Sequence, residues 1–209
     1  MSSSQAPARG ARLPRGARRV QLLDAAREIF VAQGYHAAAM DDIAERAGVS
    51  KPVLYQHFPG KRELYLALLQ EHATELFEAV RAALDSTPDN KQRVAATLGA
   101  YFAFVDSESA AFRLVFESDL TNDPEVRQLV ENVTVGCAQL FTQVIQEDTG
   151  LEHQEAELLA VALAGMAQVT ARYWLRTGCV VPRETADRLV AQLAWRGIRG
   201  FPKNESRAG

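Results

Sequence analysis

The sequence has little of what a disulfide-stabilised or membrane-spanning protein requires. Cysteine occurs twice in 209 residues, at Cys137 and Cys179, and the pair forms neither a CxxC motif nor a metal-ligand spacing. We therefore expect two reduced thiols in a cytoplasmic protein. The longest apolar run, Leu158 to Ala167, is shorter than the ~20 residues that cross a bilayer. The first nineteen residues lack the apolar core of a secretory signal, so we expect no membrane partner.

Catalytic signatures are also missing. The chain contains no HExxH, P-loop or GxSxG sequence, and its histidines at 36, 57, 72 and 153 stand apart from one another. We therefore predict a binding protein rather than an enzyme, with no metal and no cofactor. A helical adaptor that binds only other proteins is a third class, and the distribution of charge argues against it.

That distribution is uneven. Residues 1–62 carry ten basic and five acidic side chains, while the remainder carries thirteen basic and twenty-one acidic ones. A basic N-terminal part suits nucleic-acid binding, because neutralising phosphates supplies most of the sequence-independent affinity. A solvated, arginine-rich tail would give the same composition, so charge alone leaves both interpretations open.

Helical periodicity runs through almost the whole chain, and no convincing period-two alternation appears. We predict an all-α fold of about nine helices, three short ones in an N-terminal head and six in a larger body. The expected organisation is a disordered basic arm over 1–17, the head over 18–62, the body over 63–201 and a disordered tail over 202–209. The arm could follow a DNA backbone or enter a minor groove, or it could have no function. The helices are expected at about residues 22–34, 41–47, 51–57, 61–84, 90–106, 110–117, 124–149, 152–177 and 182–200.

The segment DDIAERAGVSKPVLYQHF has the anatomy of a helix-turn-helix. Small residues at Ala44 and Ala47 let two short helices approach closely, and Gly48 permits the tight turn between them. Ser50 has a side-chain oxygen that can cap the second helix. An ordinary helical hairpin is the alternative interpretation of the same spacing.

The segment from Val20 to Leu69 resembles the DNA-binding domain of the TetR family of bacterial transcription regulators. The resemblance lies in LLDAAREIFVAQGY, DDIAERAGVS and KPVLYQHFPGKRELYLALL. It implies a partner, double-stranded operator DNA, which two groups of side chains would contact. The residues near base edges would be Lys51, Pro52, Val53 and Gln56, and those holding phosphates would be Ser50, Tyr55, His57 and Lys61.

Two positions depart from the family pattern. Ala39 stands where a capping threonine is usual, which costs ~1 kcal/mol and weakens a phosphate contact there. Asp41 and Asp42 in the next turn offset part of this cost through the helix dipole. Gly60 replaces the small polar residue that commonly precedes Lys61.

The last two predicted helices indicate a homodimer. The helix over 152–177 is apolar nearly all round from Leu158 to Val169, so both of its sides need covering. Pairing it and the last helix with their symmetry mates would give a four-helix interface, as the resemblance also implies. The last helix presents an apolar stripe of Ala186, Leu189, Val190, Leu193, Gly197 and Ile198.

The rest of the body mixes large rings with small residues, which suits either a tight core or an elongated apolar cavity. Its motifs TPDNKQR, FRLVFESD, DPEV and ARYWL resemble those of actinobacterial TetR-type regulators of fatty-acid biosynthesis genes. That resemblance implies a long-chain acyl-CoA effector, which we expect to release the DNA; activation and repression both remain open. The alternative is a TetR-type repressor of an efflux or catabolic operon that responds to another hydrophobic small molecule. The expected tunnel residues are Leu84, Phe102, Val105, Phe116, Phe141, Leu163 and Met166.

Overall fold

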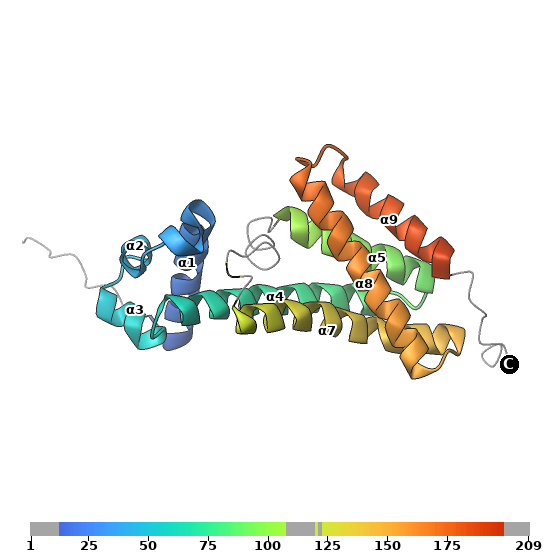
Figure 1. The fold of residues 1–209 in the computed structure, drawn as a ribbon, viewed down its shortest axis with the longest axis horizontal. Coiled ribbons are helices and arrows are strands. Elements are labelled where there is room, and N and C mark those ends of the chain that lie inside the picture. The colour runs from blue at the N-terminus through green and yellow to red at the C-terminus, as the bar shows by residue number, and fades with distance from the viewer. Residues whose placement is uncertain (1–12, 108–119, 121–122, 199–209) are drawn as a thin grey trace, which may run out of the picture. The chain divides into compact units, whose positions relative to one another are not determined.

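A computed structural model describes residues 13–107, 120 and 123–198, and every regular element in these residues is a helix (Figure 1). The predicted all-α class is confirmed. The expected helix over 110–117, the arm over 1–12 and the tail from 199 lie outside the described residues. The eight described helices are α1 (Arg15–Ala37), α2 (Met40–Arg46), α3 (Lys51–His57), α4 (Lys61–Asp85), α5 (Asn90–Ser107), α7 (Pro124–Thr149), α8 (His153–Arg176) and α9 (Arg183–Ile198).

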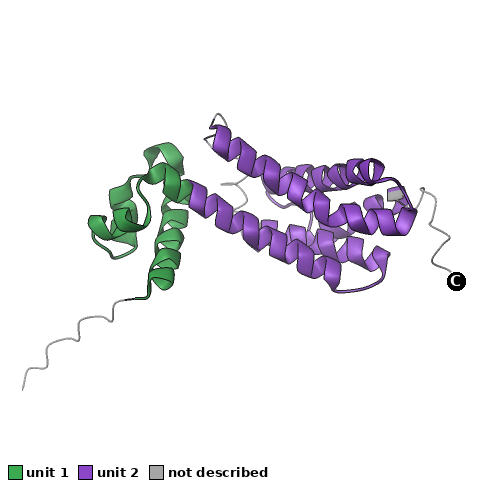
Figure 2. Cartoon of the chain, turned by 90° about the horizontal axis from the view of Figure 1, so that it is seen from below, with its two compact units in different colours: residues 1–65 green, residues 66–209 purple. Residues whose placement is uncertain are grey.

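The chain divides into an N-terminal unit, residues 1–65, and a C-terminal unit, residues 66–209 (Figure 2). Helix α4 contributes its first five residues to the N-terminal unit and the rest to the C-terminal unit. Each unit has its own buried apolar residues, and they are described separately.

In the N-terminal unit, α1 changes direction near its end because Gly34 takes a φ of 76°, which suits a residue without a Cβ. The sequence predicted that helix end. The core of the unit forms where Phe30 packs edge-on against Tyr65, with ring centroids 5.0 Å apart. Ile43 of α2 and Leu54 of α3 are fully buried, so each short helix is anchored by a large apolar side chain.

Helix α7 occupies the residues predicted for it, 124–149, and local interactions define both of its ends. Asp123 caps the helix, and its Oδ1 accepts hydrogen bonds from the backbone N–H groups of Glu125 and Val126 at 2.9 and 3.3 Å. Pro124 occupies the first helical position, where the missing N–H costs little. Gly150 ends the helix in the left-handed conformation, with a φ of 71°.

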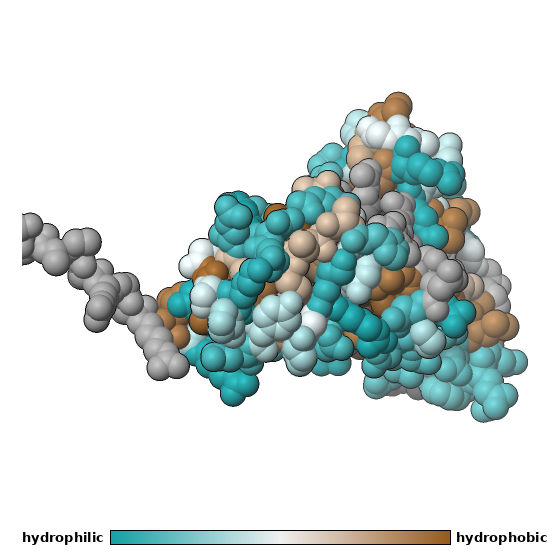
Figure 3. Space-filling model, turned by 60° about the vertical axis from the view of Figure 1, so that its left-hand side comes forward, coloured by the Kyte–Doolittle hydropathy of each residue, from teal (hydrophilic) through white to brown (hydrophobic). Residues whose placement is uncertain are grey.

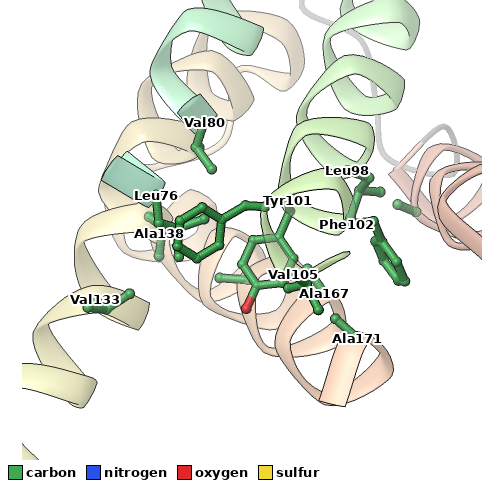
Figure 4. Close-up of a cluster of buried hydrophobic side chains, with 14 of the residues drawn as sticks. Leu76, Val80, Leu98, Tyr101, Phe102, Val105, Val133, Ala138, Ala167 and Ala171 are labelled. Atoms are coloured by element: carbon green, nitrogen blue, oxygen red, sulfur yellow. The ribbon is translucent and has the colours of Figure 1, made fainter. Parts of the chain in front are cut away.

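The core of the C-terminal unit lies among α4, α5, α7, α8 and α9. Figure 4 shows its centre, where Tyr101 and Phe102 point in different directions from α5. Helices α4 and α7 approach closely at one point, because a Cβ on Gly136 would lie 2.5 Å from the ring of Phe77. A larger residue at 136 would push the two helices apart.

Helix α8 is long and apolar enough, by length and composition alone, to cross a membrane. Its alanines at every third or fourth position, from Ala156 to Ala171, are buried in the core of the C-terminal unit. That periodicity is typical of a helix that packs against others in a globular unit. The opposite side of α8 leaves apolar side chains uncovered, among them Leu158 and Val169.

Candidate DNA-binding site and ligand cavity

Helix α3 presents its polar residues outward and holds itself in place through one apolar residue. Leu54 is fully buried, while Lys51, Pro52, Tyr55 and Gln56 are exposed. Val53 and His57 are half-buried, and Ser50, just before the helix, is exposed. The predicted base-reading residues therefore lie on an accessible face, as a recognition helix requires. Their contacts with DNA stay predictions.

Neither of the two N-cap residues discussed above makes a side-chain capping bond in the described structure. Ser50 is the N-cap of α3, but its side chain makes no capping hydrogen bond within the described residues. Ala39 is the N-cap of α2, and it makes no such bond because alanine has no polar side-chain atom.

Lys51 forms an ion pair with Asp41, in the first turn of α2. The ammonium group of Lys51 has further N–H donors that a guanine could accept.

Lys61 makes contacts in the structure that the sequence did not suggest, and its contact with phosphate stays a prediction. Its Nζ donates to the backbone carbonyls of Tyr35, His36 and Ala38 at 2.8, 3.1 and 2.9 Å. It also lies 4.6 Å from the centroid of the Tyr35 ring. An ammonium group has three N–H donors, and here all three are used. The side chain therefore ties the end of α1 to the start of α4, which sequence spacing could not reveal.

A cluster of cations next to α3 was missed by the sequence analysis. Helix α1 begins at Arg15, earlier than the predicted start near residue 22, so Arg15, Arg18 and Arg19 lie on one side of it. The guanidinium of Arg19 lies 4.6 Å from the Phe58 ring centroid. Desolvation and then the charges of these three arginines lower the pKa of His57 below its ordinary value. The i, i+3, i+4 spacing of the arginines was the signal that could have identified the cluster.

DNA binding should therefore be linked to proton uptake at His57. A nearby phosphate favours the charged imidazole and raises the pKa of His57 in the complex, whereas the free protein holds that pKa below 6.5. The complex then carries more protons than the free protein, so the affinity for DNA rises as pH falls from about 7.5 to about 6. The rise is at most about tenfold per pH unit for each N-terminal unit that binds. Anisotropy titrations at fixed ionic strength measure this slope, and His57→Gln should remove it. Equal slopes in both proteins would contradict the linkage.

The base-reading role predicted for α3 can be tested one residue at a time. Gln56→Ala should cost ~1–3 kcal/mol at one adenine position and relax specificity there, because a bidentate amide pair is lost. Val53→Ala should act in the same selective way at a thymine methyl. Competition titrations with operator variants measure both. If Gln56→Ala alters neither affinity nor sequence preference, the recognition helix is misplaced.

The C-terminal unit contains a cavity lined by residues of α4, α5, α7, α8 and α9. The cavity has a volume of about 90 Å³ and is partly open to solvent. Four residues predicted for the tunnel line it: Leu84, Phe141, Leu163 and Met166. A mostly apolar cavity between helices is a common setting for a small-molecule site.

The other three predicted tunnel residues do not line this cavity in the described structure. Phe102 and Val105 are buried core residues, because Phe102 points away from Tyr101 and packs against Trp174 at 5.7 Å between ring centroids. Figure 4 shows this separation of the two rings. Phe116 lies outside the described residues.

The cavity wall carries few charges. Burial raises the pKa of the Cys137 thiol to about 12 and raises the pKa of Tyr101, so both stay neutral at physiological pH. Arg93 and Asp148 supply the charged lining residues within the described structure. The second thiol, Cys179, is exposed in the turn between α8 and α9.

Helices α8 and α9 leave apolar side chains exposed. On α9, Leu189 and Leu193 are 55% and 64% exposed, Val190 is half-buried and Gly197 is exposed. On α8, Tyr173 is 60% exposed. In Figure 3, hydrophobic colouring also interrupts the hydrophilic surface at the top, where Figure 1 shows the turn between α8 and α9. Large exposed apolar side chains on neighbouring helices mark a surface that another chain can cover.

The sequence of this chain is similar to those of bacterial transcription regulators. A family model for the bacterial regulatory proteins of the tetR family matches residues 22–68. Over 198 residues the chain is 47% identical to the HTH-type transcriptional activator FasR of Mycolicibacterium smegmatis, covering 95% of this chain and 90% of that protein.

Solved structures agree on the fold. A TetR-like transcriptional regulator from Rhodococcus sp. RHA1 has a TM-score of 0.72 and 29% identity, covering 90% of this chain and 100% of that one. The transcriptional regulator FadR of Bacillus subtilis, in complex with stearoyl-CoA, has a TM-score of 0.71 and 19% identity, covering 84% and 96% of the two chains.

The chain belongs to the TetR family of DNA-binding transcription regulators and is not an enzyme. Its N-terminal helices form the helix-turn-helix of that family. Regulators of this family bind operator DNA and dimerise.

Proposed function

We propose that this protein is a cytoplasmic, homodimeric regulator of fatty-acid or lipid metabolism genes that releases operator DNA when it binds a long-chain acyl-CoA. The observation that carries the proposal is the apolar cavity among five helices of the C-terminal unit. A hydrophobic chain gains ~0.8 kcal/mol for each methylene it buries there.

The relatives support the same ligand class. The body motifs resemble those of regulators of fatty-acid biosynthesis, and the similar protein FadR of Bacillus subtilis was solved with stearoyl-CoA. The FasR of Mycolicibacterium smegmatis is a transcriptional activator, so release of DNA by this chain could turn a gene off rather than on.

Dimerisation through α8 and α9 would give the DNA-binding units their function. Two recognition helices must reach the same DNA face about one helical turn, ~34–36 Å, apart. Covering Leu189, Val190, Leu193 and Gly197 with the same residues of a second copy gives an isologous interface. This arrangement would also remove the large exposed apolar side chains of α9 from water.

Helix α4 offers a route from ligand to DNA. It begins at Lys61, in the N-terminal unit, and Val80 and Leu84 near its end line the cavity. An acyl chain pressing on those residues would favour one position of α4 over another. The ligand shifts this equilibrium only through different affinities for the two states, typically ~1–3 kcal/mol of coupling.

Filling the cavity should abolish the response without affecting DNA binding. Leu163→Phe should raise the palmitoyl-CoA concentration for half-release of operator DNA at least about tenfold, because the larger ring occupies space the chain needs. Operator affinity without effector should stay within about twofold. Val135→Phe is the control, since Val135 is an exposed apolar residue of α7 that does not line the cavity.

The same titration tests the effector itself. Release should improve steeply with acyl length and should need the chain, so CoA alone should be inactive. If palmitoyl-CoA and CoA act identically, the acyl-CoA proposal fails. The alternative, a repressor of an efflux or catabolic operon with another hydrophobic effector, then stands, because the apolar lining would accept any elongated hydrophobic molecule.

A further inference from the structure

Thr97 of α5 is a buried polar residue in the wall of the cavity. It is 95% buried, with a relative exposure of 5%, and it lines the cavity. Its Oγ1 has no hydrogen-bond partner in the described structure. Buried hydroxyl groups are nearly always paired, so an unpaired one needs an explanation.

Other buried threonines show how this cost is usually avoided. Thr142 donates to the carbonyl of Ala138 at 3.0 Å, and Thr149 donates to the carbonyl of Ile145 at 2.7 Å. Each uses the carbonyl four residues earlier in its own helix. Thr97 makes no such bond to Arg93 within the described residues. Its hydroxyl group is therefore available to a molecule that enters the cavity.

The charges around Thr97 restrict what that molecule can present. Arg93, one turn earlier and ~6 Å along the axis of α5, uses its Nε to donate to the carbonyl of Thr87 and its Nη1 to donate to Asn90 Oδ1, at 2.7 and 3.2 Å. Those bonds hold the guanidinium towards the turn before α5. Asp148 is the acidic residue of the lining, and it disfavours a second carboxylate. A neutral acceptor suits the site better than a carboxylate.

We propose that the Thr97 hydroxyl group donates a hydrogen bond to the carbonyl oxygen of a bound acyl thioester, and that the cavity thereby selects thioesters over alkyl chains and free fatty acids. This inference rests on the proposed function of the cavity as the effector site. Thr97 then acts as a specificity-determining residue, because losing its partner leaves a buried polar group unpaired.

The test compares palmitoyl-CoA with S-hexadecyl-CoA, a thioether of the same length that has no carbonyl oxygen. Calorimetric titration should show that the natural protein prefers the thioester about tenfold, the effect of one buried hydrogen bond. Thr97→Val, which keeps the volume and removes the hydroxyl group, should bind both ligands equally. Thr97→Ser should keep most of the preference.

Thr142→Val is the control, because it removes a buried threonine hydroxyl group that already has a partner and does not line the cavity. It should keep the tenfold preference. A preference that survives in Thr97→Val, or palmitate binding as tightly as palmitoyl-CoA, overturns the assignment of Thr97 while leaving the acyl cavity intact. If neither CoA derivative binds the natural protein, the proposed function fails first, and this inference fails with it.

Discussion

Leu193→Glu should convert the protein to a monomer and reduce operator affinity by at least about a hundredfold. Leu193 is 64% exposed in the single chain, and in an isologous dimer each subunit would bring its own substituted copy to the interface. Burying an unpaired carboxylate there is strongly unfavourable. A monomer engages one half-site only, so DNA affinity falls although the DNA-binding unit is unchanged.

Sedimentation velocity gives the mass of the variant, and anisotropy gives its affinity for the operator. Val135→Glu is the control, because Val135 is also an exposed apolar residue but lies on α7. It should remain dimeric and keep its affinity. If Leu193→Glu also sediments as a dimer, the interface lies elsewhere on the molecule.

Lys61→Met should loosen the N-terminal unit by about 2–3 kcal/mol, because three carbonyl groups lose a charged donor. The aliphatic part of the side chain is retained, so the loss reports the ammonium group. The affected carbonyls belong to Tyr35, His36 and Ala38, at the end of α1. Amide hydrogen exchange at Ile43 and Leu54, the buried anchors of α2 and α3, measures opening of this unit separately from the rest of the chain.

A phosphate-binding lysine would behave differently. Its loss would shallow the dependence of log affinity on log salt by ~1 and leave hydrogen exchange unchanged. Lys51→Met is the comparison for a lysine that we expect at the DNA, near base edges, because Lys51 is exposed on the recognition helix. Faster exchange with an unchanged salt slope supports the structural role of Lys61, and the opposite pair of results restores the phosphate role.

Features set by neighbouring residues were predictable from the sequence. The ends of α7 follow from Asp123, Pro124 and Gly150, whose effects act within one helical turn. The interactions of Lys61 with the end of α1 were not predictable, because donor and acceptors lie 23 to 26 residues apart. Ser50 has the chemistry of a cap, but its side chain makes no capping hydrogen bond in the described structure.

Helical periodicity predicted only some of the residues that line the cavity. Leu163 and Met166 could be chosen because few positions on α8 combine bulk with an inward face. On α5, buried apolar residues occur on several sides, so the pattern could not distinguish Phe102 in the core from Leu98 at the cavity. Thr97 was overlooked because a single hydroxyl group among apolar residues carries no periodic signal.

The two thiols of this chain differ strongly in their exposure to solvent. Cys179 lies exposed in a turn, while Cys137 is 5% exposed in the wall of the cavity, with a pKa of about 12. An alkylating reagent therefore reaches Cys179 directly, but it reaches the buried Cys137 only as the helices around the cavity move apart. The ratio of the two alkylation rates measures how often the cavity opens, with the exposed thiol as an internal reference in the same molecule and without any introduced label.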